Sequence, residues 1–351
     1  MLTYLRLILL PFSVLYALVI VTRNKLYDWG IFRSYQFDLP VISVGNLAVG
    51  GSGKTPATEY LVRLLSQYKI AILSRGYGRK TKGFLLADPL ATADTIGDEP
   101  LQYFHKFENI TVAVCEDRVK GIKLLRDTHD LIILDDAFQH RSVLPGLSLL
   151  LFEFSKLRRR QWMLPAGNLR EPFPGYRRAD VILVTKCPDS GVEERELVVN
   201  KFNKTEHKPV YFSSIKYGSL VPVYQINLQV PTTPSVFLLT GIANSEPLLT
   251  YIKSQYEVLD QFRFADHHVF TVAEIKQLTE AFRSAPGKEK IIITTEKDSK
   301  RLLDGAIKEL LVNLPVFYLP IQMELSPEDA GLFDKTILTY VSNTTRNRTI
   351  Y

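Results

Sequence analysis

Short apolar runs recur along the chain, and most of them contain no alternating polar residue. Such runs are typical of strands that are buried on both faces of a parallel sheet. Between them, apolar residues return every three or four positions, for example over 57–65, as in helices that pack on a sheet. The pattern predicts alternating strands and helices with a parallel sheet. Its strands are expected over residues 41–44, 70–73, 111–114, 131–134, 147–152 and 181–184.

The pattern changes near residue 208. Polar and apolar residues alternate over 209–220, and Gly218 and Pro222 break the alternation, which predicts an antiparallel ribbon or a linker. Beyond Pro234 the apolar runs return, and a helical pattern covers 272–283. We therefore expect a second, smaller α/β domain. Its strands are expected over residues 236–239, 291–294 and 316–319.

The chain begins with an apolar segment. Residues 7–21 carry no charge and are interrupted only by Pro11 and Ser13. A helix of this length spans about 23 Å, which is short of the ~30 Å hydrocarbon core of a bilayer. Counted from Leu2, with Arg6 reaching the headgroups, it is just long enough to cross. We expect this helix to associate with the membrane, and both a spanning and an interfacial position stay open.

Composition adds three constraints. A chain of 351 residues with 46% hydrophobic residues is long enough for two α/β domains with buried cores. The formal charge of +6 suggests an acidic partner, and charge alone leaves nucleic acid, anionic lipid and a phosphorylated substrate open. The only cysteines, Cys115 and Cys187, lack metal-ligand spacing, so neither a disulfide framework nor a zinc site is expected.

The most informative segment is 45–56, which reads Gly-Asn-Leu-Ala-Val-Gly-Gly-Ser-Gly-Lys-Thr-Pro. A strand, a glycine-rich turn, Lys-Thr and a helix are together typical of a P-loop, which binds phosphate oxygens through backbone N–H groups. Lys54 is expected to reach the outer phosphates of a nucleoside triphosphate, and the Thr55 hydroxyl to hold Mg²⁺. Ala48 replaces the first glycine of the general pattern. The residues expected at the nucleotide are Val49, Gly50, Gly51, Ser52, Gly53, Lys54 and Thr55.

The predicted fold class is α/β, with a P-loop NTPase-type parallel sheet core, a second, smaller α/β domain and an N-terminal membrane helix. The polar end of the chain is expected to fray. The expected parts are the membrane-associated helix and linker (1–35), the P-loop domain (36–207), a β-ribbon linker (208–230), the C-terminal α/β domain (231–341) and a polar tail (342–351).

Two carboxylates, Asp135 and Asp136, follow the expected strand 131–134. Adjacent carboxylates at a strand end repel each other without a cation, and a P-loop protein needs an acidic partner for Mg²⁺ at such a position. Either Asp135 or Asp136 is therefore expected at the metal. The polar residues that follow, Gln139 and His140 among them, are candidates for contact with phosphate or substrate.

Three further segments carry candidate chemistry. Residues 74–80 form a flexible basic loop that suits a phosphate. Asp98 lies in the turn Gly-Asp-Glu-Pro, where the simplest interpretation is a helix cap. Asp266, His267 and His268 are better suited to proton transfer by one histidine and a carboxylate than to metal binding, because three neighbouring residues cannot all face one ion.

Taken in order, these segments resemble the tetraacyldisaccharide 4'-kinase family of lipid A biosynthesis. The resemblance extends over most of the chain and both expected domains, and its motifs are GNLAVGGSGKTP, GDEP, DDAFQHR, LPAGNLREP, DHH and TEKD. A P-loop alone is shared by many families, whereas this combination is highly specific. The short apolar helix also looks like the family's membrane anchor.

The resemblance implies transfer of the γ-phosphoryl group of ATP to the 4'-hydroxyl of tetraacyldisaccharide 1-phosphate, which gives lipid IVA, with ATP and Mg²⁺ as cofactors. It implies that Asp98 is the base, supported by His267, and that Arg170 and Glu171 lie near the nucleotide and metal. The implied catalytic residues are Lys54, Asp98, Asp136 and His267; the implied metal ligands are Thr55, Asp135, Asp136 and Glu171; the implied substrate contacts are Arg75, Tyr77, Arg118, Gln139 and His140.

The partners that the resemblance implies are the lipid substrate and the membrane surface, and not nucleic acid; no protein partner is inferred. The expected location is the cytoplasmic face of the bacterial inner membrane, where the N-terminal helix would hold the enzyme.

Two other functions stand as alternatives. A membrane-associated nucleotide switch is suggested only by Thr185-Lys186-Cys187-Pro188, a faint match to a guanine-reading motif in which both side chains that would select guanine are replaced. A P-loop kinase of a soluble sugar is disfavoured by the apolar helix, whose removal is expected to leave such an enzyme unaffected and to impair a lipid kinase.

Overall fold

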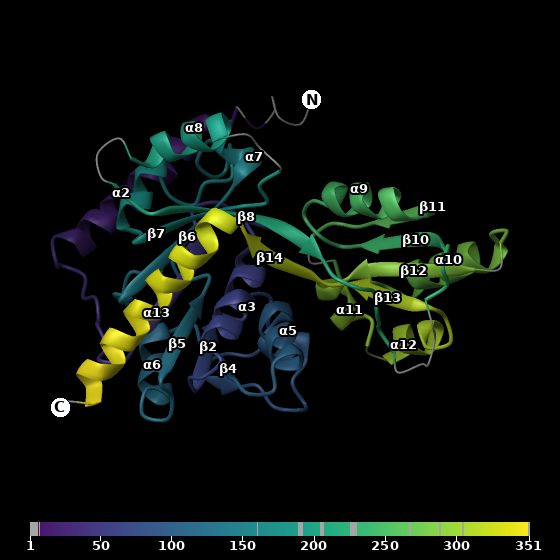
Figure 1. Cartoon of the computed structure of the whole chain (residues 1–351), viewed down its shortest axis with the longest axis horizontal. Coiled ribbons are helices and arrows are strands. Elements are labelled where there is room, and N and C mark those ends of the chain that lie inside the picture. Colours follow the sequence, from purple (N-terminus) through teal and green to yellow (C-terminus); the bar gives the residue numbers. More distant parts are fainter. Residues whose placement is uncertain are drawn as a thin grey trace. The chain divides into compact units, whose positions relative to one another are not determined.

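The computed structural model describes residues 6, 8–159, 161–188, 192–203, 207–224, 230–266, 268–287, 289–303 and 305–349. The chain forms two compact units, and most of their elements are labelled in Figure 1. The first unit comprises Met1–Lys216 and Met323–Tyr351, and the second comprises Tyr217–Gln322. The chain therefore leaves the first unit once and returns to it.

The first unit contains a nine-stranded sheet with the order β14-β8-β7-β6-β1-β5-β2-β4-β3. The strands from β8 to β4 in this order are parallel, and β3 is antiparallel to β4. The strands are β1 (Val41–Asn46), β2 (Ile70–Ser74), β3 (Leu85–Leu86), β4 (Thr111–Val114), β5 (Leu131–Asp135), β6 (Leu147–Glu153), β7 (Val181–Thr185), β8 (Val210–Tyr217) and β14 (Ile321–Leu325).

Helices cover both faces of this sheet, which explains why its strands are apolar without alternation. Residues of α3, α5 and α13 pack on one face, and residues of α6, α7, η1 and α8 pack on the other. These elements are α3 (Lys54–Leu64), α4 (Ala93–Ile96), α5 (Asp98–Lys106), α6 (Arg118–Leu125), α7 (Phe154–Leu157), η1 (Phe173–Arg178), α8 (Val192–Phe202) and α13 (Pro327–Thr349).

The N-terminal helix α2 (Leu10–Asp28) packs against the rest of the first unit through its polar side. Ser13 is buried, and its Oγ donates to the Met163 carbonyl at 3.0 Å. On its other side, Phe12, Leu15 and Leu18 are each at least 60% exposed. None of the helices in the described ranges combines the length and the apolar character needed to cross a bilayer.

The second unit is a five-stranded sheet with the order β11-β10-β12-β13-β9. Its strands are parallel except for β9, and α9 packs on one face while α10 and α12 pack on the other. The elements are β9 (Val221–Pro222), β10 (Ser235–Thr240), β11 (Glu257–Arg263), β12 (Lys290–Thr295), β13 (Val316–Leu319), α9 (Glu246–Gln255), α10 (Val272–Ser284), α11 (Glu296–Arg301) and α12 (Gly305–Leu311).

The predicted strands are confirmed, and so is the α/β parallel core with a second, smaller α/β unit. The ribbon predicted over 208–230 is wrong for its first half, because β8 pairs in parallel with β7 and belongs to the large sheet. The polar residues of β8 reflect partial exposure near the end of that sheet and not a hairpin.

The predicted end of the second domain at 341 is also wrong. Residues from Met323 onward return to the first unit, where Phe333, Ile337 and Val341 of α13 pack into the core of the large sheet. The tail predicted to fray from 342 is helical up to Thr349, because it continues α13.

Candidate active site

The carboxyl ends of β1, β2 and β5 lie side by side in the large sheet. Val44 of β1 pairs with Asp135 of β5, and Leu73 of β2 pairs with Leu134. Ligands bind at the carboxyl ends of parallel strands in sheets of this type. The residues that follow these strands, including the P-loop and the Asp135–Asp136 pair, therefore meet at one end of the sheet.

The P-loop leads directly into α3. Gly53 has a φ of +83°, which disfavours any residue with a Cβ, and it is the N-cap of the helix. The helix then begins at Lys54 with no side-chain cap, so the N–H groups of its first turn are open to a phosphate. Thr185 Oγ1, at the end of β7, donates to the Ser52 carbonyl at 2.8 Å and holds the loop. These are the features that the predicted nucleotide-binding segment requires.

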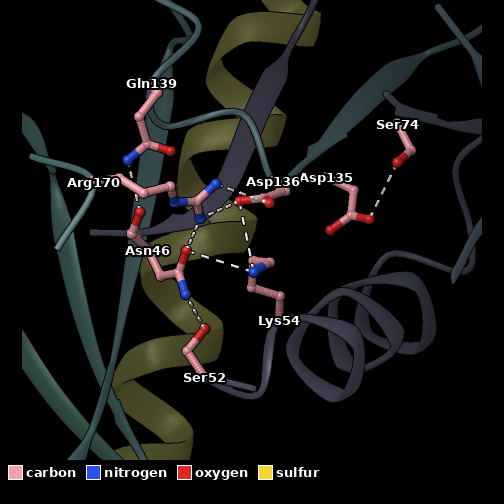
Figure 2. Close-up of polar contacts among 8 residues, drawn as sticks. All are labelled: Asn46, Ser52, Lys54, Ser74, Asp135, Asp136, Gln139 and Arg170. Carbon is pink, nitrogen blue, oxygen red and sulfur yellow. Dashed lines mark hydrogen bonds and ion pairs between the residues drawn. The ribbon is translucent and has the colours of Figure 1, made fainter. Parts of the chain in front are cut away.

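Two cations converge beside the loop (Figure 2). Lys54 Nζ lies 3.6 Å from Asp136 Oδ1 and 3.5 Å from Asn46 Oδ1. Arg170 donates to the two carboxylate oxygens of Asp136 at 3.2 and 2.8 Å, and also to Asn46 Oδ1. Positive charge at this position is what a triphosphate requires of its binding site.

Asp136 is held between these cations. Its backbone is left-handed, with a φ of +48°, which Asp tolerates better than most residues. Burial acts to raise the pKa of the Asp136 carboxyl, but the charges of Lys54 and Arg170 outweigh burial and hold the pKa below its usual value. Asp136 is therefore ionised in this site.

Asp135 has a different environment. It is buried, and its Oδ2 accepts from Ser74 Oγ at 3.5 Å. Burial, together with the negative charges of Glu99 and Asp136, raises the pKa of Asp135 well above its usual value. Its Oδ1 is buried without a hydrogen-bond partner. An orphaned carboxylate oxygen fits a divalent cation, although the part of the chain that the structure describes contains no cluster of three or more His, Cys, Asp or Glu residues suited to a metal.

Arg170 is positioned through its main chain. Its N–H donates to the Leu47 carbonyl at 2.7 Å, and its carbonyl accepts from Tyr16 Oη of α2 at 3.1 Å. The Asn168 carbonyl accepts from Val49 N at 2.8 Å, so that the segment lies along the start of the P-loop. The predicted placement of Arg170 beside the nucleotide loop agrees with this geometry.

Glu171 is fully buried, and its Oε2 accepts from Asn24 Nδ2 and Arg178 Nη2, both at 2.9 Å. These hydrogen bonds connect Glu171 with α2 and η1. A role of Glu171 at the nucleotide or the metal therefore stays a prediction.

The substrate candidates near this site differ in environment. Gln139 Nε2 donates to the Asn46 carbonyl at 2.8 Å. Arg118 is 2% exposed and donates to the Cys115 and Glu116 carbonyls, and burial lowers its pKa to about 10. Arg118 therefore supports the main chain here, and its contact with substrate stays a prediction.

His140 is partly buried, and its Nε2 has no hydrogen-bond partner. Burial and the nearby charge of Arg118 lower the pKa of His140 to about 4. The ring is therefore neutral at physiological pH and still able to bind a polar group.

The loop with Arg75 and Tyr77 crosses the start of α5. A Cβ on Gly97 would lie only 2.9 Å from the Tyr77 carbonyl, so this close approach requires glycine. Arg75 and Tyr77 are exposed. Asp98 is the first residue of α5 and not its N-cap, because Gly97 holds that position; the helix-cap interpretation is therefore wrong. The structure thus brings Asp98 and the basic loop together.

The predicted supporting histidine, His267, lies outside the described residues. Its neighbours are anchored within the second unit: Lys297 Nζ lies 3.9 Å from Asp266 Oδ1, and His268 Nε2 lies 2.9 Å from Glu274 Oε2. The pairing of Asp98 with His267 stays a prediction.

Several residues of the site had no sequence-based prediction. Asn46 and Glu99 lie within predicted motifs, so their place in the motif was the available signal. Glu153 accepts from Lys156 Nζ and Lys186 Nζ at 3.0 and 3.4 Å. Both ammonium groups lie beside the P-loop, 3.6 Å and 3.8 Å from where Cβ atoms on Gly50 and Gly51 would be. No local pattern connects these lysines with the loop.

Comparison with known proteins supports one family. The family model of Tetraacyldisaccharide-1-P 4'-kinase matches residues 5–341. The Tetraacyldisaccharide 4'-kinase of Bacteroides thetaiotaomicron is 41% identical, covering 97% of this chain and 94% of the relative. The protein of that name from Flavobacterium psychrophilum is 43% identical, covering 98% and 99%. The crystal structure of LpxK from Aquifex aeolicus in complex with ATP has a TM-score of 0.74 and 32% identity, covering 96% and 99%. The chain therefore belongs to the tetraacyldisaccharide-1-P 4'-kinase family.

Proposed function

We propose that this chain transfers the γ-phosphoryl group of ATP to the 4'-hydroxyl of tetraacyldisaccharide 1-phosphate and so gives lipid IVA. Family membership supports the reaction, and the relatives named above carry that activity in their names. The observation that carries the proposal is the convergence of Lys54 and Arg170 beside a P-loop that opens onto the N-terminus of α3.

Phosphoryl transfer depends on positioning and on neutralising charge. The loop N–H groups and the first turn of α3 would bind the phosphate oxygens. Lys54 and Arg170 would offset the charge that develops on the transferred group. Both cations contact Asp136, so a triphosphate would compete with that carboxylate for them.

Asp135, Asp136 and the Thr55 hydroxyl would hold Mg²⁺. The orphaned Asp135 Oδ1 and the ionised Asp136 supply oxygen ligands of the kind that this ion prefers. When bound, Mg²⁺ would neutralise phosphate charge and orient the triphosphate.

Asp98 would accept the proton of the sugar hydroxyl. Its position at the start of α5, next to the basic loop of Arg75 and Tyr77, supports a substrate headgroup at that point. His267 would support Asp98 by orienting it or by relaying the proton, and the two roles stay open.

The enzyme would act at the cytoplasmic face of the inner membrane. The exposed Phe12, Leu15 and Leu18 of α2 would enter the interface, and a tetraacylated substrate would meet the enzyme there. The formal charge of +6 would favour an anionic surface and a phosphorylated headgroup.

The proposal is tested with radiolabelled ATP, Mg²⁺ and detergent-dispersed tetraacyldisaccharide 1-phosphate. Label is expected on the lipid, and Lys54→Ala should lower the rate about a hundredfold or more because it removes a phosphate contact. Lys120→Ala, which changes an exposed lysine of α6, is the matched control and should be unaffected.

Other outcomes would identify the alternatives. Inorganic phosphate released without labelled lipid would favour a nucleotide switch. Label on a soluble sugar, and none on the lipid, would favour a soluble-sugar kinase. Each result is interpreted only for protein whose folding has been verified by circular dichroism.

A further inference from the structure

Asn46, the last residue of β1, joins four residues of the candidate site (Figure 2). It is 1% exposed. Its amide nitrogen donates to Ser52 Oγ at 2.7 Å, and its main-chain carbonyl accepts from Gln139 Nε2 at 2.8 Å. Its Oδ1 accepts from Lys54 Nζ at 3.5 Å and from Arg170 Nη2. One buried amide thus connects the P-loop with the segments that carry Gln139 and Arg170.

The chemistry of the partners fixes the orientation of this amide. Lysine and arginine side chains can only donate hydrogen bonds, so Oδ1 must face Lys54 and Arg170. The amide NH₂ then faces Ser52, whose hydroxyl can accept. Both ends of the side chain are used, which accounts for an asparagine that is almost fully buried.

The Asn46 amide oxygen is an uncharged acceptor, and this affects the net charge of the site. Lys54 and Arg170 carry two positive charges, and Asp136 supplies one negative charge against them. The group therefore keeps a net positive charge. A carboxylate in place of the Asn46 amide would cancel that charge at the point where a triphosphate must bind.

We propose that Asn46 is a positioning residue that holds Lys54 and Arg170 together for the phosphates of ATP without neutralising them. This inference rests on the proposed function, since it concerns the same nucleotide. It assigns to Asn46 an effect on ATP binding that exceeds any effect on folding.

The competing explanation is that Asn46 only braces the P-loop. Asn46→Asp separates the two, because a carboxylate is nearly the same size and accepts from both cations, while the Ser52 hydroxyl can turn to donate to it. If Asn46 only supports the P-loop, ATP binding should survive this change. If Asn46 positions the two cations and must stay neutral, ATP binding should weaken.

ATP binding is measured by isothermal titration calorimetry on the full-length chain in detergent, and folding by thermal unfolding. Asn46→Asp should raise the Kd for ATP on the order of tenfold or more, with little change in Tm. Asn203→Asp is the matched control: Asn203 Oδ1 accepts from Lys208 N at 3.0 Å, away from the motif, and the same chemical change should leave the Kd unchanged.

An unchanged Kd in folded Asn46→Asp would overturn the inference. If this variant does not fold, Asn46→Ala is measured alone and with Arg170→Ala; the inference requires a smaller effect of Asn46→Ala once Arg170 is absent, and additive effects would contradict it. Failure of the wild-type chain to bind ATP would instead count against the proposed function.

Discussion

Two neighbouring residues of one type, Asp135 and Asp136, acquire opposite properties in this site. Asp135 is buried near Glu99, and burial raises its pKa although the charges of Lys54 and Arg118 act in the opposite direction. Asp136 lies between Lys54 and Arg170, so its pKa falls despite burial. Asp135 is the last residue of β5, and Asp136 follows it with a left-handed backbone.

His140 offers a test at the residue scale. Its pKa in the folded chain, about 4, lies below the ordinary value of 6.5, so between these values the unfolded chain binds more protons. Stability should therefore fall as the pH is lowered through this window. From pH 7 to pH 5 the wild type should lose about 1 kcal/mol more unfolding free energy than His140→Gln, after allowance for partial exposure of the ring. Chemical denaturation at both pH values measures the difference, and parallel losses would contradict it.

The positions of site residues were predictable where a motif carries them. Local order predicted that Lys54 and the Asp pair lie at the same end of the sheet; their roles and that of Thr55 stay predictions. The role proposed for Asn46 was not predicted from the sequence, because an asparagine after a strand is equally typical of a turn. Its partners Gln139 and Arg170 are also far away in sequence. Lys156 and Lys186 were missed for the same reason.

At the scale of elements, a network around one buried carboxylate connects the P-loop helix with the helix that begins at Asp98. Glu59 of α3 is 1% exposed and accepts from Gln102 of α5 at 2.9 Å. It also lies 2.8 Å from Lys106 and 3.1 Å from Arg63. The network fixes α3 against α5, and with them the phosphate loop and the proposed base.

Glu59→Ala should therefore destabilise the first unit by about 2 kcal/mol, because it leaves the buried Gln102 amide without its acceptor and removes the partner of the partly exposed Lys106 and Arg63. The change is measured as the free energy of unfolding in urea. Glu108→Ala, at an exposed position just beyond α5, is the control and should have little effect. Equal stability of the two variants would show that the network is solvated and contributes little.

The outward side of α2 gives a second test at this scale. Replacement of Phe12, Leu15 and Leu18 by glutamine should abolish flotation with vesicles of phosphatidylethanolamine and phosphatidylglycerol, because it removes the apolar surface. ATP binding should persist, since these side chains point away from the site. Leu90→Gln, which changes an apolar residue that is 85% exposed elsewhere, is the control. Flotation of the triple variant at the wild-type level would count against membrane binding through α2.

At the scale of the whole molecule, the second unit is one continuous segment. Residues 217–322 contain their own sheet, with helices on both faces. Expressed alone, this segment should fold and unfold cooperatively on heating. Asp298→Ala should abolish the transition, because buried Asp298 accepts from Gly241 N, Thr295 Oγ1 and Arg301 Nη1. A wild-type segment without a cooperative transition in circular dichroism would show that it depends on the rest of the chain.

The sequence predicted most of the strands, since buried parallel strands are apolar throughout, and it failed at the boundaries between units. β14 and α13 return to the first sheet through tertiary pairing that no local period records. The strand β11 was missed because it lies at a sheet edge, where polar residues such as Asp260 and Gln261 are tolerated.

Helix α2 has a polar side that contacts the first unit and an apolar side that is exposed, and this has a practical consequence for preparing the enzyme. A chain shortened to begin after Asp28 would lose Tyr16, Arg23 and Asn24, which hold the segments of Arg170, Gln139 and Glu171. Lost turnover in such a chain would report a damaged pocket as readily as a missing anchor. A form for inhibitor screening without detergent should instead keep the helix and make only its outward residues polar.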